Sequence, residues 1–283
     1  MQPGKASRTA ELVCMGRAVA DAQRLTPQFQ DPTAVTLLSD EAQQRVRHFL
    51  AGDAPQGFRA TLRYRHLERL SKLMAARSVA IDELLRRVPT RQVVILGAGL
   101  DGRAWRMPEL RDATVFEVDH PDSQREKRAR VGTLTQAARE VRFVAVDFAR
   151  DDLDAALGNA GHDPSAPTIW IWEGVVMYLE LQDIEATLRV IERRSAPQSH
   201  LCIVYHSPAP MLWLVGMVLR RMGEPLRSSF TAQAMQTLLA RYGFHVERDE
   251  NVHDVGARLS GELGKALAPI RHLRIVTAQR SRR

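Results

Sequence analysis

The sequence predicts an α/β fold in which helices cover both faces of a mostly parallel, seven-stranded sheet and a helical extension precedes it. Five short apolar runs, rich in β-branched and aromatic residues, lie at 91–99, 112–120, 141–148, 168–174 and 200–207. Segments with helical spacing separate most of them, as in sheets built from parallel strands with right-handed crossovers. Two further strand-like runs lie near the C-terminus, at 242–251 and 272–280.

The residues before the first strand are predicted to be helical. Apolar residues recur at spacings of three and four over 6–23, 30–50 and 58–88, and the breaks fall at Pro27, Pro32 and residues 52–57. We therefore divide the chain into a helical N-terminal extension, 1–90, and a sheet-containing domain, 91–283.

The last part of the chain adds a helical block at 208–222, a helix at 231–241 and the final two strands. No convincing helix-length crossover separates these strands, so we expect them to form an antiparallel pair at one edge of the sheet. The apolar segment 211–219 belongs to a helical insertion near 208–230. This insertion is expected either to fold over a cleft as a lid or to be ordinary core.

Composition and charge exclude several classes of protein. With 283 residues, 45% of them hydrophobic, the chain can bury a sizeable core. The net charge is +7, and the basic residues are dispersed along the chain apart from clusters at 124–130 and 279–283. The sequence contains no basic stripe interleaved with aromatic residues, so nucleic-acid binding is not expected. The longest apolar run covers about half of the ~20 residues that cross a bilayer, so no membrane partner is expected. Cys14, Cys202 and the histidines show no metal-ligand spacing, and the absence of a secretory segment favours a cytoplasmic location.

One glycine-rich turn predicts a nucleotide-like ligand. Residues 93–105 read VVILGAGLDGRAW, so that Gly97, Gly99 and Gly102 satisfy the G-x-G-x-x-G pattern of a dinucleotide-binding turn. A strand that ends in glycines lets a ligand approach the backbone closely. The next strand ends at Asp119, where an acid reaches ribose hydroxyls. We therefore expect this turn to bind a nucleoside.

Acidic residues around the turn favour S-adenosylmethionine over NAD. Asp101 lies inside the turn, where a carboxylate would repel the pyrophosphate of a dinucleotide. The third and fourth strands also lead into acids, Asp147 and Glu173, at the edge where open α/β sheets bind ligands. Carboxylates are favourable beside a sulfonium and an ammonium group.

Several motifs in order resemble one family. GAGLDGRAWRM, FEVDHP, VDF and WEGVVMYL, together with SRTAE, QDPTA and ARSVAID nearer the N-terminus, are similar to the leucine carboxyl methyltransferase-like family of class I S-adenosylmethionine-dependent methyltransferases. The resemblance is to its bacterial branch that acts on small molecules. It implies a Rossmann-like fold, S-adenosyl-L-methionine as cofactor, a catalytic domain at 91–283 and an extension that covers cofactor and substrate. Gly102 stands where the family usually has threonine, and this substitution alone creates the dinucleotide pattern.

The resemblance also implies roles for individual residues. Arg77 matches the arginine that pairs with the methionine carboxylate of the cofactor, a charge-assisted contact. The remaining implied contacts are Gly97 and Gly99 under the methionine part, Asp119 at the ribose with Glu117 close by, Asp147 and Phe148 beside the adenine, and Glu173 after the fourth strand.

The expected reaction is methyl transfer to an oxygen of a small molecule, and a secondary metabolite is the expected acceptor. A carboxylate acceptor is already ionised, whereas a hydroxyl acceptor requires a general base. His206 and Tyr178 are the candidate catalytic residues. A hydrogen-bonded structural histidine explains His206 at least as well, and Tyr178 is expected to line the pocket or orient the substrate rather than act as a base. An NAD-dependent oxidoreductase and a non-catalytic cofactor-binding module are the alternatives, and either a monomer or a homodimer is expected.

Overall fold

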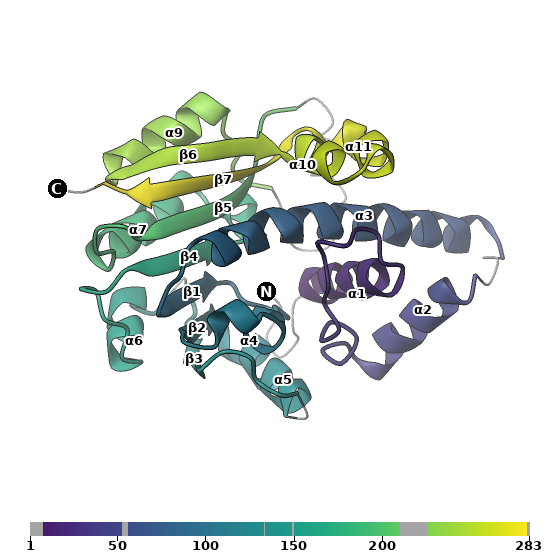
Figure 1. The fold of residues 1–283 in the computed structure, drawn as a ribbon, viewed down its shortest axis with the longest axis horizontal. Helices are drawn as coiled ribbons and strands as arrows, with labels where there is room; N and C mark the ends of the chain where they lie inside the picture. Colours follow the sequence, from purple (N-terminus) through teal and green to yellow (C-terminus); the bar gives the residue numbers. More distant parts are fainter. Residues whose placement is uncertain (1–7, 53–55, 133, 149, 210–225, 282–283) are drawn as a thin grey trace.

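The computed structural model describes residues 8–52, 56–132, 134–148, 150–209 and 226–281, in which seven strands form one sheet (Figure 1). The strands are β1 (Gln92–Leu96), β2 (Thr114–Asp119), β3 (Glu140–Ala145), β4 (Thr168–Trp172), β5 (His200–His206), β6 (Phe244–Asn251) and β7 (Leu273–Arg280). Their order is β3-β2-β1-β4-β5-β7-β6, with β1 to β5 parallel and β7 antiparallel to both neighbours. The predicted fold class is confirmed, and the antiparallel strand lies one position in from the edge.

The register of the central strands brings several strand ends together. Leu96 at the end of β1 pairs with Val118 on β2 and with Trp172 on β4. The residue that follows each of these three therefore lies at the same carboxyl edge of the sheet, namely Gly97, Asp119 and Glu173. In open α/β sheets this edge is where ligands bind.

Helices cover both faces of the sheet, because the central strands are apolar on both sides. Trp170 and Trp172 of β4 pack in one core with α6, α7 and α9, while Ile169 and Ile171 pack in the other with α3, α4, α10 and α11. The helices that precede or cover the sheet are α1 (Arg8–Ala22), α2 (Asp40–Leu50), α3 (Phe58–Arg87), α4 (Arg103–Arg106), α5 (Pro121–Val131), α6 (Leu153–Asn159), α7 (Leu181–Arg193), α9 (Ala232–Arg241), α10 (Val252–Leu259) and α11 (Gly261–Leu267).

The long helix α3 joins the N-terminal helices to the sheet. Figure 1 shows its C-terminal half against the sheet and its N-terminal half extending beyond it, beside α1 and α2. A separate small core lies among these helices, in which buried Val19, Leu37 and Phe49 contribute from α1, the following turn and α2. Leu100, from the turn after β1, belongs to the same core and links it to the sheet edge.

Two local predictions were wrong. The segment 30–50 was expected to be helical with a break at Pro32, but the chain turns through 32–38 and helix α2 begins only at Asp40, where the Ser39 hydroxyl accepts a hydrogen bond from the Ala42 N–H. The strands β6 and β7 were expected to lack a helical connection, yet α10 and α11 join them. These helices have 8 and 7 residues, and they pack closely against each other at Gly256 and Gly264. Helices of this length are too short to be recognised from the spacing of apolar residues.

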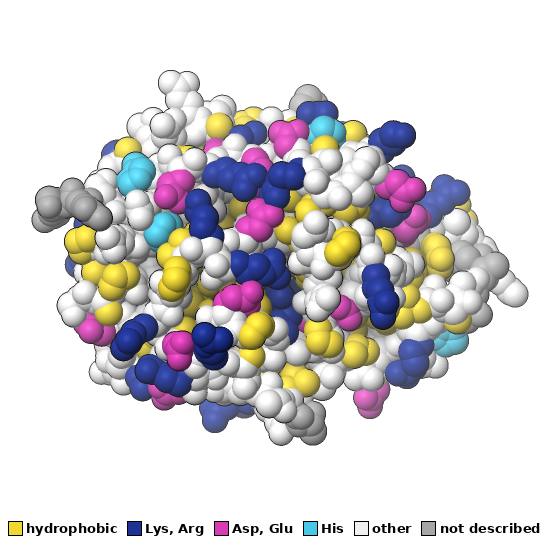
Figure 2. All heavy atoms as spheres, viewed as in Figure 1, with side chains coloured by type: hydrophobic (Ala, Val, Ile, Leu, Met, Phe, Trp, Pro, Cys, Tyr) yellow, Lys and Arg dark blue, Asp and Glu magenta, His cyan; other side chains and the backbone are white. Residues whose placement is uncertain are grey.

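Most of the expected insertion near 208–230 lies outside the described residues, which resume at 226. The helix expected at 231–241 is present as α9. No helix among the described residues has the length and apolar character needed to cross a bilayer. On the face drawn in Figure 2, basic side chains are interspersed with acidic and hydrophobic ones.

Candidate active site

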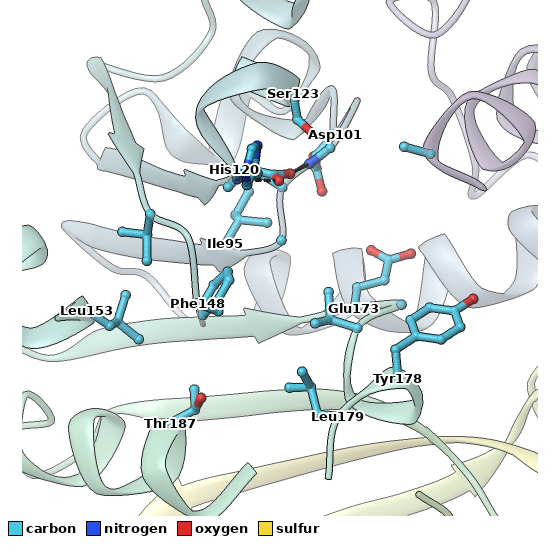
Figure 3. Close-up of a pocket in the computed structure, with 18 of the residues that line it drawn as sticks. Ile95, Asp101, His120, Ser123, Phe148, Leu153, Glu173, Tyr178, Leu179 and Thr187 are labelled. Carbon is cyan, nitrogen blue, oxygen red and sulfur yellow. Dashed lines mark hydrogen bonds between the residues drawn. The ribbon is translucent and has the colours of Figure 1, made fainter. Parts of the chain in front are cut away.

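A cavity of about 990 Å³ opens at the carboxyl edge of the sheet (Figure 3). Its walls come from the turn after β1, the residues that follow β2, β3 and β4, one side of α1 and one side of α7. Figure 3 shows Asp101, His120 and Ser123 gathered on one side, and Glu173 and Tyr178 on another. Eight of the ten residues expected at the site line this cavity: Arg77, Gly97, Gly99, Asp119, Asp147, Phe148, Glu173 and Tyr178.

The glycine turn brings the backbone close to the cavity. Gly97 and Gly99 have φ of 68° and 47°, a left-handed conformation that favours glycine. A Cβ atom on Gly97 would also overlap the Cγ2 atom of Val175, which follows β4. Larger residues at Gly97 would therefore strain the turn and collide with the wall of the cavity.

Asp119 is held by the backbone of this turn. Its Oδ2 atom accepts a hydrogen bond from the Gly99 N–H, and its Oδ1 atom accepts one from the His120 N–H at 2.6 Å. Burial raises the pKa of Asp119, although these two N–H groups oppose the shift. The carboxylate is thus fixed at the position where a ribose-binding acid is expected.

The loop after β3 supplies an apolar surface with an acid beside it. The Phe148 side chain is 36% exposed and lines the cavity, and Figure 3 shows it between Ile95 and Leu153. The Asp147 N–H donates to Asp151 Oδ2 at 2.8 Å, which fixes the loop. A flat, partly apolar group would pack against this surface.

Glu173 bridges two arginines at the end of β4. Its Oε1 atom lies 2.6 Å from Arg77 Nε, and its Oε2 atom accepts a hydrogen bond from Arg103 Nη1 at 2.9 Å. Burial opposes ionisation, but these two guanidinium groups together lower the pKa of Glu173 below its ordinary value. Glu173 is therefore an ionised carboxylate that already has two cationic partners.

These residues belong to a balanced network of four basic and four acidic side chains. Every member is at most 14% exposed, and neighbouring members are linked by ion pairs. The members are Arg17, Arg77, Arg103, Arg106, Asp31, Asp82, Asp101 and Glu173. The network joins α1 and the turn after it to α3, to the glycine turn and to the end of β4.

Asp101 is not the free carboxylate that the sequence suggested. It is buried, and it forms an ion pair with Arg103, whose backbone N–H also donates to Asp101 Oδ1 at 2.7 Å. Burial opposes ionisation, but the Arg103 guanidinium holds the pKa of Asp101 well below its usual range. Its charge is therefore compensated, and repulsion of a pyrophosphate by Asp101 is a weaker argument than the sequence implied.

Gly102 has a packing role. A Cβ atom at this position would overlap the Thr33 hydroxyl and lie 3.1 Å from Asp31 Oδ1. That hydroxyl donates to Asp31 Oδ1 at 2.6 Å, and Asp31 is a member of the buried network. The glycine thus lets the turn after α1 pack against the turn after β1. This packing explains a glycine at position 102 without a dinucleotide ligand.

Two expected site residues do not line the cavity. Glu117 lies inside the sheet, where its Oε2 atom is 2.6 Å from Lys127 Nζ and burial raises its pKa to about 7. His206, at the end of β5, stacks on His272 with ring centroids 5.2 Å apart. Burial, then His272 and Arg77, lower the pKa of His206 to about 4. Neither side chain faces the cavity that the other eight surround.

Sequence reasoning missed Arg17, Arg103 and Asp82. Arg17 and Arg103 line the cavity, and Asp82 anchors Arg103 from α3 with 2.7 Å between Oδ1 and Nε. The sequence offered only weak signals for two of these residues. Asp82 is a charged residue in an otherwise apolar, buried part of α3, five residues after Arg77, and Arg103 directly follows the glycine turn. Among the described residues, no group of three or more His, Cys, Asp or Glu side chains is arranged to hold a metal ion.

Comparisons with solved structures identify the fold. A methyltransferase structure from Thermobifida fusca, itself titled as putative, aligns with a TM-score of 0.63 at 13% identity, covering 99% of this chain and 97% of that one. A DUF574 family protein from Streptomyces avermitilis aligns with a TM-score of 0.61 at 12% identity, covering 98% and 99%. At such low identity these likenesses support the fold alone.

Comparisons of sequence identify the family. A relative from Mycobacterium sp. (strain JLS), named "Putative S-adenosyl-L-methionine-dependent methyltransferase", is 36% identical over 159 residues, which are 56% of this chain and 52% of the relative. One of the same name from Mycobacterium tuberculosis (strain ATCC 25177 / H37Ra) is 40% identical over 147 residues, 50% of this chain and 48% of the relative. The chain thus spans about half the length of the curated relatives it matches. The profile of the leucine carboxyl methyltransferase family matches residues 10–192, well over half of the sequence, and the chain belongs to this family.

Proposed function

We propose that this protein is an S-adenosylmethionine-dependent methyltransferase that transfers a methyl group to an oxygen atom of a small molecule. The guanidinium of Arg77 is the observation that carries the proposal. Its Nε atom is paired with Glu173, while within the described residues its Nη1 and Nη2 atoms make no hydrogen bond. Arg77 lines the cavity and is 7% exposed. Two unused donors on one buried guanidinium suit a bidentate contact with a carboxylate.

The other cavity residues fit the remaining parts of this cofactor. Arg77 would hold the methionine carboxylate, Gly97 and Gly99 would lie under the methionine part, and Asp119 would accept hydrogen bonds from the ribose. Phe148 offers its exposed ring to the adenine, with Asp147 beside it. When bound, the cofactor supplies an electrophilic methyl group on a sulfonium centre. The protein contributes the alignment of donor and acceptor and the exclusion of water.

The sheet topology argues against an NAD-dependent oxidoreductase. The usual dinucleotide-binding sheet has the order 3-2-1-4-5-6. Here an antiparallel β7 lies between β5 and β6. The helix after the glycine turn, α4, has only 4 residues and begins in the buried ion-pair network. That short helix is a poor pyrophosphate site compared with the long helix of a dinucleotide fold.

The residues around the cavity favour a carboxylate acceptor. Glu173 is ionised between two arginines and is a weak base. His120 accepts a hydrogen bond from the Asp122 N–H at 3.2 Å, as the cap of α5. Tyr178 lines the cavity and would orient the acceptor. An acceptor that is already ionised at neutral pH needs no proton removed. A small carboxylic acid therefore fits better than an alcohol, and a protein C-terminus is the family-based alternative.

The test is transfer of a labelled methyl group from S-adenosylmethionine to panels of small carboxylic acids, phenols and alcohols. We expect labelled product with carboxylic acids, and we expect mild alkali to release the label as methanol because methyl esters hydrolyse and methyl ethers do not. Alkali-stable product would assign the hydroxyl reaction instead. Cofactor binding with no transfer to any acceptor, including peptides with a free C-terminus, would support the non-catalytic module.

A further inference from the structure

We propose that Arg103 is a positioning residue that keeps Arg77 available to the carboxylate of the cofactor. Arg103 lies at the start of α4, and it reaches Arg77 only through Glu173. The inference rests on the proposed function, because it concerns the site of that cofactor. Arg103 lies within the motif GAGLDGRAWRM, but no role of its own was predicted for it from the sequence.

Arg103 is fixed by three carboxylates. Its Nε atom donates to Asp82 Oδ1 at 2.7 Å, and its Nη1 atom donates both to Asp101 and to Glu173 Oε2, the latter at 2.9 Å. The side chain is 3% exposed. A planar guanidinium with donors in a rigid fork can hold three carboxylates in one arrangement, whereas a lysine ammonium is a point charge.

The arrangement divides the two oxygens of Glu173 between two arginines. Oε1 faces Arg77 Nε at 2.6 Å, while Oε2 is held by Arg103. Because Oε2 is occupied, Glu173 cannot use both oxygens to pair with the fork of Arg77. Within the described residues, the Nη1 and Nη2 atoms of Arg77 therefore keep no carboxylate partner, and Arg77 lines the cavity. Without the fork of Arg103, Glu173 can rotate onto Arg77, and the two would form a closed pair that excludes a second carboxylate.

Arg106 provides a matched control. It lies on the same short helix, its side chain is also 3% exposed, and its Nη2 atom is 2.7 Å from Asp82 Oδ2. Its other carboxylate partner is Asp31, at 3.6 Å. Within the described part of the chain it has no ion pair with Glu173. Replacing the guanidinium of Arg106 therefore disturbs the same buried network but leaves the ion pair between Arg103 and Glu173 in place.

The experiment compares Arg103→Lys with Arg106→Lys, using two ligands measured by calorimetry. S-adenosylhomocysteine carries the amino-acid carboxylate, and 5′-methylthioadenosine lacks the whole amino-acid part. We expect Arg103→Lys to lower the affinity for S-adenosylhomocysteine at least tenfold while the affinity for 5′-methylthioadenosine changes less than twofold. Arg106→Lys should change both affinities less than threefold. If Arg103→Lys lowers the affinity for both ligands equally, or for neither, the positioning role is overturned.

A double-mutant cycle tests whether Arg103 acts through Arg77. In an Arg77→Met background, Arg103→Lys should have no further effect on the affinity for S-adenosylhomocysteine. A second full tenfold loss in that background would show that Arg103 acts independently. If Arg103→Lys does not fold, Asp82→Ala removes the Nε anchor of Arg103 from outside the cavity. This variant should lower the affinity for S-adenosylhomocysteine at least threefold relative to the affinity for 5′-methylthioadenosine. An unchanged ratio of the two affinities would contradict the positioning role.

The failure of this inference is distinguishable from the failure of the proposed function. If the wild-type protein binds neither ligand, the cofactor assignment fails and Arg103 has no such role. If the wild-type protein binds both and the Lys variant binds them equally well, only the positioning role fails.

Discussion

Arg77 on α3 and Glu173 after β4 form an ion pair with 2.6 Å between Nε and Oε1, and both residues line the cavity. The sequence suggested a cofactor contact for each of them separately. The pair leaves the outer donors of Arg77 unused within the described residues, whereas both oxygens of Glu173 are already engaged. Arg77 is therefore the residue of the two that has binding capacity left for an anionic group.

Arg77→Ala is expected to weaken the binding of S-adenosylhomocysteine by about 1.5 to 3 kcal/mol, because one hydrogen-bonded charge contact is lost. Isothermal calorimetry measures the change. Arg87→Ala is the control, since Arg87 lies on the same helix but is 57% exposed and paired with Glu247 away from the cavity. Equal affinities of the wild type and Arg77→Ala would remove Arg77 from the site.

Gly102→Ala is expected to destabilise the protein by about 1 to 3 kcal/mol, because the added methyl group overlaps the Thr33 hydroxyl. Replacing that hydroxyl as well, in Gly102→Ala/Thr33→Ala, should recover part of the loss. Urea unfolding of the two single variants and the double variant gives the coupling. Gly132→Ala is the control, since a Cβ there meets nothing within 4 Å. Strictly additive losses would show that the two residues do not compete for this space.

Much of the fold was predictable because the strands β1, β2, β4 and β5 are buried on both faces and so appear as continuous apolar runs. The alternation of Trp170 and Trp172 with Ile169 and Ile171 places each residue on one face, and neither face is polar. The glycine turn and the strand-terminal acid Asp119 were predictable for a related reason, since parallel strands end at the same edge.

The contacts made by individual side chains were less predictable. Glu117 pairs in register with Ile95 inside the sheet, two residues before Asp119, and a lysine from α5 meets it there. The family resemblance implied a place for Glu117 near the ribose, next to Asp119. The Arg103 contacts join the glycine turn to α3 and to the end of β4, which are distant in the sequence, so no local sequence pattern predicts them.

Glu117 should make stability depend on pH. Burial raises its folded-state pKa to about 7, above the ordinary value of 4.5, so the folded state holds a proton that the unfolded state releases. The stabilising contribution of this bound proton to the free energy of unfolding is therefore fully present below about pH 4.5, and it is lost as the pH rises toward 7. Relative to Glu117→Gln, the free energy of unfolding of the wild-type protein should fall by on the order of 1 to 3 kcal/mol between pH 5 and pH 8.

Urea unfolding of the wild type and Glu117→Gln at pH 5, 6, 7 and 8 measures this difference, and the subtraction removes the titration of groups that both proteins share. A difference that does not change with pH would contradict a raised pKa for Glu117 in the folded protein.

His206 is expected to be dispensable as a base. Its ring packs on His272 outside the cavity, and its pKa is lowered to about 4 by burial, then by His272 and Arg77. With a carboxylic acid as acceptor, His206→Gln should lower kcat less than tenfold, whereas loss of a general base lowers rates by about 10² to 10⁴. Steady-state kinetics decide between these values, and a loss of a hundredfold or more would restore His206 as the catalytic base.

Parallel calorimetric titrations with S-adenosylmethionine, S-adenosylhomocysteine and NAD test the central claim most directly. The arrangement of Arg77, the glycine turn and Asp119 predicts that both adenosyl compounds bind with micromolar affinity and that NAD does not bind. Binding of NAD alone, with no heat from either adenosyl compound, would contradict the methyltransferase assignment.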